Sequence, residues 1–238
     1  MLNKIVIFDL DDTIYPESSY NLACYQAASK VFLADYGVDL YSEIELRFNQ
    51  RQYRDLFSRA IKAKGGEVSE EYIFTQLVQA YRTHAPELKP YDGFLSCILE
   101  LKSRYRLAII TDGNSSIQRQ KIQALGIAPY FDFILCSSEL GKGISKPMAL
   151  PYEKVLNFFG VSPQDSVYIG DNQSKDFIYP NQVGMHSIHL LNLEENSNLI
   201  YYDAVGQPAR HLCYSYSSLM KILSELWMHD DSVEESTR

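Results

Sequence analysis

Three aspartates stand close together near the start of the chain, directly after a short apolar run. The stretch is "IVIFDLDDTIY", residues 5–15, and its acids are Asp9, Asp11 and Asp12. Carboxylates this close repel one another and raise each other's pKa, so a fold that keeps them usually sets positive charge against them. The stretch therefore predicts a site that holds a cation, to which other parts of the chain contribute.

Two later apolar runs also end in polar residues. Residues 106–110, "RLAII", lead into Thr111-Asp112-Gly113-Asn114, and residues 167–169, "VYI", lead into Gly170-Asp171-Asn172. The carboxyl ends of parallel strands share one edge of a sheet, and ligands bind in the crevice there. We therefore expect these clusters to converge with Asp9, although they are far apart in the sequence.

The elements that must position these residues are short buried strands that alternate with helices. The expected strands are residues 4–8, 106–110, 131–136, 166–169 and 186–190. Helical apolar spacing covers 115–125 and 151–159, each followed by a glycine that suits a helix end. This alternation predicts an α/β fold with a doubly wound, mostly parallel sheet.

A long insertion separates the first strand from the second. Apolar spacing near three and four makes it mostly helical, over residues 21–36, 42–64 and 69–83. The helix at 93–104 belongs instead with the sheet. The expected domains are an α/β core of residues 1–15 and 89–228, a helical domain of residues 16–88, and a flexible tail of residues 229–238.

The converging groups suit one kind of chemistry. Carboxylates from different strands make a hard oxygen site for Mg²⁺, and Thr111 offers a hydroxyl and nearby backbone N–H groups to an anion. Lys146, in "SKP" before a helix, adds a fixed positive charge. Together they fit a bound phosphoryl group that one carboxylate attacks while a second moves the proton.

These motifs resemble those of the haloacid dehalogenase superfamily of hydrolases. The resemblance rests on Asp9-Leu10-Asp11-Asp12-Thr13 for D-x-D-x-T, on Thr111 at a strand end, on Lys146, and on Gly170-Asp171 with Asp176 for G-D-x-x-x-x-D. All four motifs occur in the family's order. They cover most of the expected core, and the helical insertion matches the subgroup with a helical cap after the first strand.

The resemblance also implies a role for each matching residue. Asp9 would be the nucleophile, and Asp11 the general acid and base, with its backbone carbonyl on the metal. Asp9, Asp11, Asp171 and Asp176 would form the Mg²⁺ site. The substrate phosphate would be held by Thr111 and Lys146, with Asp112, Gly113 and Asn114 beside it. Asp112 is equally suited to organising its turn.

Two positions leave alternatives open. Many relatives reach the lysine through "G-x-x-K-P", whereas this chain has "GKGISKP", so Lys142 is a second candidate beside the favoured Lys146. In the helical insertion, Arg47, Arg51 and Arg54 are expected on one helix face. That face could clamp an acidic substrate, but we favour a solvated surface with Glu43 and Glu45 as partners.

The expected function is a Mg²⁺-dependent phosphatase acting on a small phosphorylated metabolite such as a sugar phosphate or nucleotide. A phosphomutase or phosphotransferase on the same core is the alternative, and so is a silent phosphate-binding protein, although no motif residue is missing. Asp11 argues against a dehalogenase. The insertion argues against a signalling receiver module.

Bulk composition narrows the partners and the compartment. The net charge of −8 argues against a nucleic-acid binder. No apolar run approaches the ~20 residues that span a bilayer, and the N-terminus does not read as a signal peptide. The four cysteines are scattered and suggest no disulfide framework. We therefore expect a cytoplasmic protein with no membrane partner.

Overall fold

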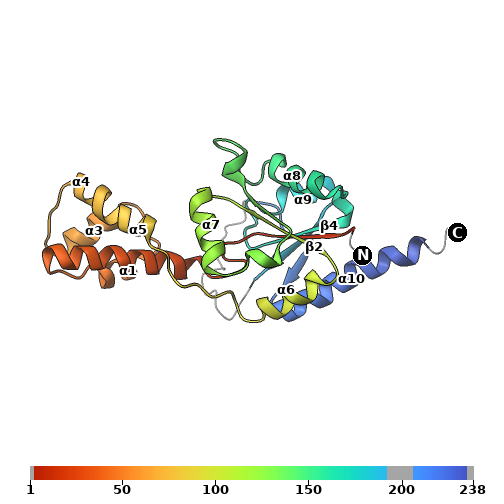
Figure 1. Cartoon of the computed structure of the whole chain (residues 1–238), viewed down its shortest axis with the longest axis horizontal. Helices are drawn as coiled ribbons and strands as arrows, with labels where there is room; N and C mark the ends of the chain where they lie inside the picture. Colours follow the sequence, from red (N-terminus) through yellow and green to blue (C-terminus); the bar gives the residue numbers. More distant parts are fainter. Residues whose placement is uncertain (1–2, 192–205, 235–238) are drawn as a thin grey trace. The chain divides into compact units, whose positions relative to one another are not determined.

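The computed structural model of the chain describes residues 3–191 and 206–234. The chain divides into two compact units, which we call the core unit, residues 1–16 and 89–238, and the helical unit, residues 17–88 (Figure 1). The sequence assigns no role to the segment 191–212, of which residues 192–205 lie outside the described residues.

The core unit is built on a six-stranded sheet with the order β3-β2-β1-β4-β5-β6. Every neighbouring pair in it is parallel, so the predicted doubly wound parallel sheet is confirmed. The strands are β1 (Ile5–Phe8), β2 (Arg106–Thr111), β3 (Phe133–Cys136), β4 (Ser166–Gly170), β5 (His186–Leu190) and β6 (His211–Cys213). The edge strand β6 was not predicted.

Strand β1 lies in the middle of the sheet because its sequence is apolar throughout. All four residues of "IVIF" are buried, as expected for a strand covered on both faces. Phe8 pairs with Ile109 on one side and with Ile169 on the other. This register brings the residues that follow β1, β2 and β4 to the same edge of the sheet.

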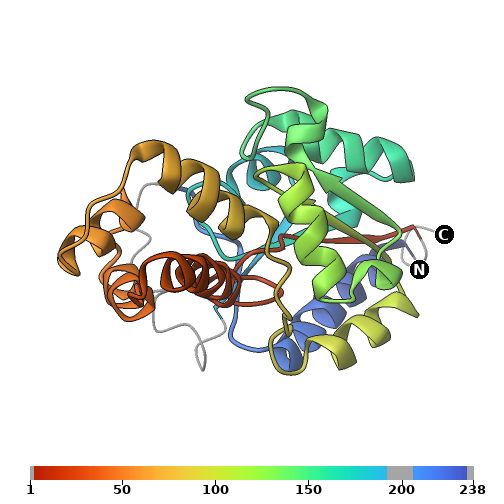
Figure 2. The same ribbon diagram turned by 60° about the vertical axis from the view of Figure 1, so that its left-hand side comes forward.

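Helices cover both faces of the sheet. Helices α6 (Phe94–Lys102) and α10 (Tyr216–Glu234) pack against each other on one face, and α8 (Ala149–Phe159) and α9 (Ile178–Val183) cover the other (Figures 1 and 2). Helix α7 (Ser115–Ala124) contacts β3. Three short 3₁₀ helices also lie in the described part of this unit: η2 (Ala128–Tyr130), η3 (Ser137–Leu140) and η4 (Pro163–Asp165).

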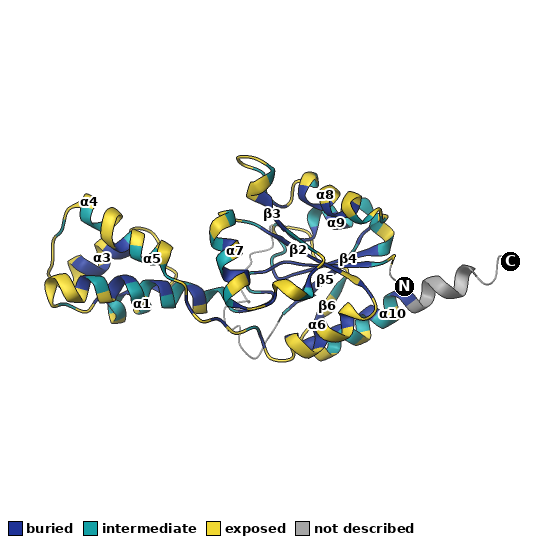
Figure 3. Ribbon diagram, viewed as in Figure 1, coloured by how far each residue is buried: buried dark blue, intermediate teal, exposed yellow. Residues whose placement is uncertain are grey.

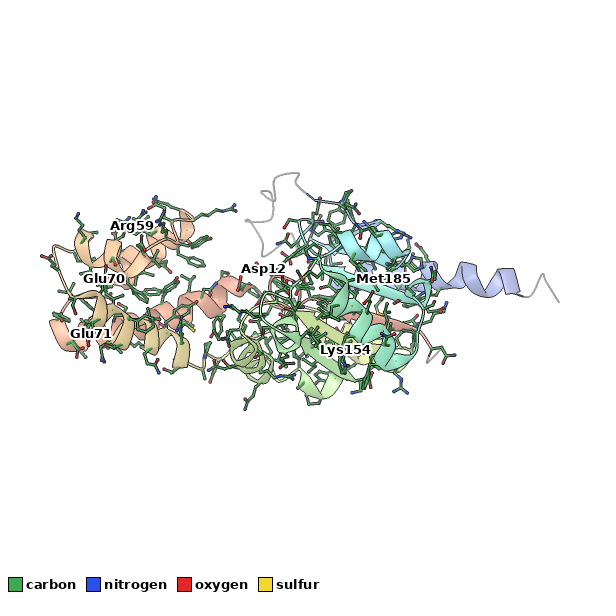
Figure 4. The ribbon with its side chains drawn as sticks, turned by 90° about the horizontal axis from the view of Figure 1, so that it is seen from above. Asp12, Arg59, Glu70, Glu71, Lys154 and Met185 are labelled. Carbon is green, nitrogen blue, oxygen red and sulfur yellow. The ribbon has the colours of Figure 1, made fainter. Side chains whose placement is uncertain are left out.

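One hydrophobic core of this unit lies between the sheet and α8. Val155 and Leu156 of α8 pack there with Ile5, Ile110 and Met185. Strands β1, β2, β4 and β5 are mostly buried, whereas the helices on the two faces keep exposed outer sides (Figure 3). Met185 and Lys154 are labelled in this unit in Figure 4. The buried strands form a rigid base for the residues at their carboxyl ends.

The helical unit contains only helices and loops among its residues. They are α1 (Glu17–Tyr36), α2 (Tyr41–Asn49), α3 (Leu56–Ala63), α4 (Glu70–Tyr72), the π-helical η1 (Ile73–Val78) and α5 (Gln79–Thr83). Ala28, Phe32, Ile44, Ala60 and Leu77 belong to its separate core. This unit therefore buries an apolar face of its own, as an independent small domain must.

The segment 42–64, expected to be helical, contains a break. Helix α2 ends at Asn49 and α3 begins at Leu56, and both Arg51 and Asp55 between them have positive φ. The stretch 49–55, "NQRQYRD", offers only Tyr53 as a large apolar side chain and so has no continuous face to bury. Regular helix cannot pass through the positive φ values.

Two further features concern the ends and the surface of the chain. Helix α10 runs to Glu234, into the segment expected as a flexible tail, and residues 235–238 lie outside the described residues. Within the ranges that the structure describes, none of the helices combines the length and the apolar character that crossing a membrane requires.

Candidate active site

The three polar clusters meet at the carboxyl edge of the sheet. Asp9 follows β1, and its backbone N–H donates to the carbonyl of Ile169 in β4 at 2.8 Å. Thr111 is the last residue of β2, and Asp171 directly follows β4. All three residues are buried. Residues separated by more than a hundred positions in the sequence thus become neighbours through the parallel register.

Lys146 supplies the positive charge at the centre of this site. Its ammonium lies 2.7 Å from Asp9 Oδ1, 2.8 Å from Asp176 Oδ1 and 2.8 Å from the Tyr168 hydroxyl. The side chain is fully buried. An ammonium has three protons, and the oxygens of Asp9 and Tyr168 accept hydrogen bonds from two of them. The second candidate, Lys142, is exposed, so the structure places Lys146 beside the predicted nucleophile.

Asp9, Asp171 and Asp176 form a group suited to a divalent cation. Each offers a carboxylate oxygen, these oxygens lie within 4.8 Å of one another, and all three residues are buried. Asp176 Oδ1 accepts no hydrogen bond of good geometry from the described residues, although Lys146 is near it. Three buried carboxylates around Lys146 are short of positive charge, and an all-oxygen donor set is what Mg²⁺ prefers. The residues therefore fit the ion.

The electrostatics of the three acids differ. Burial raises the pKa of Asp171 well above its usual value, and the neighbouring charges of Asp176 and Asp9 add to the effect. Burial also opposes ionisation of Asp9, but Lys146 and Lys175 outweigh it and hold the pKa of Asp9 below its usual value. These charges favour the ionised form of Asp9, whereas at Asp171 the effect of Lys175 is too small to offset burial and the neighbouring carboxylates.

Gly170 is required at its position by Asp176. A Cβ atom at residue 170 would overlap the Asp176 carboxylate. The same carboxylate accepts from the backbone N–H of Asn172 at 2.9 Å. The G-D-x-x-x-x-D motif therefore folds back on itself, so that its last aspartate occupies the space a side chain at its first position would fill.

Asp11 is held by three donors in the core unit. Its Oδ1 accepts from the Tyr15 hydroxyl at 2.6 Å and from Lys121 Nζ at 2.7 Å, and its Oδ2 accepts from Gln118 Nε2 at 2.7 Å. The Asp11 side chain is 21% exposed. Its carboxylate is not among the group that could hold a metal, which leaves its backbone carbonyl as the predicted contact. Asp12, in the same loop, has positive φ and is labelled in Figure 4.

The residues after β2 divide into two kinds. The Thr111 hydroxyl accepts from Gln118 Nε2 at 2.5 Å. Asp112 instead organises its surroundings, because its Oδ1 accepts from Ser137 Oγ at 2.7 Å and from the backbone N–H of Lys146 at 3.1 Å. The Asn114 side chain caps α7 by accepting from the backbone N–H of Ser116 at 3.0 Å.

Beside Asp112 and Asn114, Gly113 has a φ of 112°. A left-handed backbone of this kind favours glycine. The side chains of Asp112 and Asn114 form hydrogen bonds close to their own turn. Contact between the substrate phosphate and the backbone groups of these residues stays a prediction.

A family model described as haloacid dehalogenase-like hydrolase matches residues 6–190. The chain belongs to the haloacid dehalogenase-like hydrolase family. The matched range includes every candidate residue named above, from Asp9 to Asp176, and the whole helical unit.

Curated relatives in this family cover most of the chain. A glyceraldehyde 3-phosphate phosphatase of Methanothermobacter thermautotrophicus is 30% identical over 80% of this chain and 86% of its own length. A pyrimidine 5'-nucleotidase, PynA, of Streptococcus pneumoniae is 26% identical over 94% of this chain and 97% of its own. Both names describe proteins that act on phosphate esters of small molecules.

A solved structure of the same fold supports the haloacid dehalogenase-like architecture. The hydrolase YfnB of Bacillus subtilis, solved with bound magnesium, superposes with a TM-score of 0.65 and covers 94% of this chain and 99% of its own. At 20% sequence identity, this likeness concerns the fold.

Four residues of the site were not predicted from the sequence. Gln118 and Lys121 stand three positions apart on α7 and are buried, a spacing that places both on one helix face. Tyr168 reaches Lys146 from the middle of β4. Lys175 lies 3.9 Å from Asp112 Oδ2 and stood unremarked inside the "GDNQSKD" motif. The buried pair on α7 had no signal in the sequence, because polar residues at these positions interrupt no expected apolar face.

The arginine series of the helical unit does not form the expected face. Arg47 is on α2, but Arg51 and Arg54 follow it outside any helix, so the expectation of one shared face is wrong. Arg47 pairs with Glu43 at 2.6 Å, in line with a solvated face. Arg47, Arg59 and Lys62 nevertheless line a hollow of about 330 Å³, and Arg59 is labelled in Figure 4.

Proposed function

We propose that the chain is a Mg²⁺-dependent phosphatase that hydrolyses a small phosphorylated metabolite through an aspartyl-phosphate intermediate. The observation that carries this proposal is the position of Asp9, which lies 2.7 Å from Lys146 Nζ and close to Asp171 and Asp176. The family membership and the phosphatase names of the curated relatives support the reaction class.

Mg²⁺ would be held by Asp9, Asp171 and Asp176, with the Asp11 carbonyl as a further ligand. When bound, it would supply positive charge that neutralises the phosphoryl oxygens. Among the relatives of the same fold, YfnB binds magnesium in its crystal structure. In this chain, the support is the buried all-carboxylate group.

The first half of the reaction transfers the phosphoryl group to Asp9. A carboxylate oxygen of Asp9 attacks phosphorus as the bond from phosphorus to the substrate oxygen breaks. Asp11 gives its proton to that leaving oxygen, which departs as an alcohol. Lys146 and the Thr111 hydroxyl stabilise the charge on the phosphoryl oxygens. Lys146 also keeps Asp9 ionised beforehand.

The second half releases phosphate. Asp11, now a carboxylate, takes a proton from water as the water oxygen attacks phosphorus, and the bond from phosphorus to Asp9 breaks. Asp9 is restored as a carboxylate and Asp11 as an acid, so the cycle closes with one water consumed. Within "DLDDT", Asp9 is thus the nucleophile, and Asp11 is the general acid and base.

The helical unit is proposed to be the cap of this enzyme. It is inserted between β1 and β2, the place at which the helical-cap subgroup of the family carries its cap. A cap excludes bulk water and selects the substrate. The curated relatives differ in their substrates, since one acts on a triose phosphate and the other on nucleotides. Candidate substrates of this chain therefore come from both classes.

The test is phosphate release from a panel of phosphorylated metabolites and p-nitrophenyl phosphate, with Mg²⁺ and with EDTA. We expect release by the wild type with Mg²⁺, none in EDTA, and none by Asp9→Asn, because an amide cannot attack phosphorus. Asp92→Asn is the matched control, since Asp92 is an exposed aspartate of the core unit. Equal rates for the wild type and Asp9→Asn would refute the proposal.

A further inference from the structure

Two buried polar residues on α7 converge on the general acid. Lys121 and Gln118 are both buried. Burying an ammonium group is costly unless it is paired with an opposite charge. Lys121 Nζ lies 2.7 Å from Asp11 Oδ1, and Gln118 Nε2 lies 2.7 Å from Asp11 Oδ2. Each oxygen of this carboxylate is therefore bound by a different residue of the same helix.

Gln118 also ties the acid to the phosphate-binding hydroxyl. Its single amide nitrogen donates to Asp11 Oδ2 at 2.7 Å and to Thr111 Oγ1 at 2.5 Å. An amide group has two N–H protons, so both bonds are made at once. Asp11 Oδ2 and the Thr111 hydroxyl thus lie no farther apart than these two bonds reach. A phosphate held by Thr111 would bring its leaving oxygen close to the Asp11 carboxyl.

We propose that Lys121 and Gln118 are positioning residues that hold Asp11 for proton transfer to the leaving oxygen. This inference rests on the proposed phosphatase function. Neither residue reacts: Lys121 fixes one oxygen of the carboxylate, and Gln118 sets the other relative to the phosphate. Misplacing a catalytic group by about 1 Å costs roughly 10²-fold in rate, so loss of either contact has a large kinetic effect.

The test exploits the leaving group. p-Nitrophenolate leaves without much help from an acid, whereas an alkoxide needs the proton from Asp11. The measured quantity is kcat/KM, which covers the steps up to departure of the leaving group and omits hydrolysis of the aspartyl-phosphate. General acid catalysis contributes about 10²–10⁴-fold. We compare p-nitrophenyl phosphate with the best alkyl phosphate of the substrate panel.

In Lys121→Met, which keeps the length of the side chain, we expect kcat/KM for the alkyl phosphate to fall about 10- to 100-fold. For p-nitrophenyl phosphate we expect a change below about threefold. Gln123→Met is the matched control, because Gln123 is exposed on the same helix, and both values should stay unchanged. Equal losses on both esters, or no loss on either, would overturn the inference.

A double-mutant cycle separates positioning from general structural support. If Lys121 acts through Asp11, then adding Lys121→Met to Asp11→Asn should change the alkyl-phosphate kcat/KM by less than about twofold, because the acid is already gone. A full additional loss in that background would refute the proposal. Should Lys121→Met fail to fold, as judged by circular dichroism, Gln118→Met undergoes the same comparison and cycle.

The proposed function and the positioning role fail in different ways. A wild type that releases no phosphate from any ester refutes the proposed function, and the inference falls with it. A wild type that is active on both esters, with Lys121→Met and Gln118→Met retaining its preference between them, refutes the positioning role alone.

Discussion

Replacing Lys146 by Met should destabilise the protein strongly, because it removes the cation that two buried acids share. The Lys146 side chain is fully buried and lies 2.7 Å from Asp9 and 2.8 Å from Asp176. Met has a similar length and no charge. The variant therefore leaves the carboxylates of Asp9, Asp171 and Asp176 close together, with the charge of the partly exposed Lys175 acting on all three.

The size of the loss follows from the burial. Removing one partner of a buried ion pair costs about 3–5 kcal/mol, since an uncompensated charge is left inside the protein. For a chain of this length, each kcal/mol corresponds to roughly 2–4 °C in the melting temperature. We therefore expect the melting temperature of Lys146→Met to fall by about 6–20 °C.

The loss of stability in Lys146→Met should also depend on pH. Without Lys146, the buried carboxylates would have pKa values above those of the unfolded chain, so the native state binds more protons than the unfolded state. Its stability then falls as pH rises. The loss in Lys146→Met should accordingly be smaller at pH 5 than at pH 7.

The assay is thermal unfolding in EDTA at pH 5 and pH 7, with Lys142→Met as the matched control. Lys142 is an exposed lysine in the same segment, and its replacement should change stability by less than about 0.5 kcal/mol. Similar melting temperatures for the two variants would refute the reasoning, and so would a loss in Lys146→Met that grows as the pH is lowered.

Three further substitutions test other parts of the structure. Asp171→Asn should stabilise the protein in EDTA by about 1 kcal/mol or more. Burial raises the pKa of Asp171, so the penalty for its charge grows as pH rises above about 4. Urea unfolding should therefore show a larger gain in stability at pH 8 than at pH 5. An unchanged stability would contradict this. Gly170→Ala should weaken Mg²⁺ binding about 10- to 100-fold by displacing Asp176, and calorimetry giving wild-type affinity would count against the site. Asp39→Ala should cost about 1 kcal/mol at pH 7, because Asp39 accepts from Ser29 Oγ at 2.8 Å and from the Tyr41 backbone at 3.0 Å. These bonds lower the pKa of Asp39 in the folded protein. Their contribution to stability is therefore present above the pKa of Asp39 in the unfolded chain and should vanish as pH falls through the pKa in the folded protein. A loss of stability in Asp39→Ala that persists at pH 2 would argue against this.

The strands at the site could be predicted because their sequences are uniformly apolar. "IVIF" and "LAII" have no polar interruption, which indicates a strand covered on both faces. Each then ends at a residue with a polar side chain. Parallel pairing made the convergence of Asp9, Thr111 and Asp171 a consequence of topology, so it needed no knowledge of distances.

Other features depend on contacts that no local pattern specifies. Strand β6 has only three residues, His211–Cys213, and gains its place by pairing with β5. The break between α2 and α3 lies in a polar stretch in which helical propensity alone decides little. Lys121 looks like an ordinary surface lysine in the sequence, and its burial becomes understandable only when Asp11 is seen 2.7 Å away.

The central claim is that Asp9 becomes phosphorylated during the reaction. The most direct measurement is the mass of the peptide containing Asp9 after acid quenching of the protein with Mg²⁺ and p-nitrophenyl phosphate. Asp11→Asn is the form to use, because it lacks the base that activates water and the adduct should accumulate. We predict one added phosphoryl group on this peptide, and none when Asp9→Asn is introduced. Turnover of the ester by the wild type with no adduct at Asp9 in Asp11→Asn, and undiminished turnover by Asp9→Asn, would contradict the account.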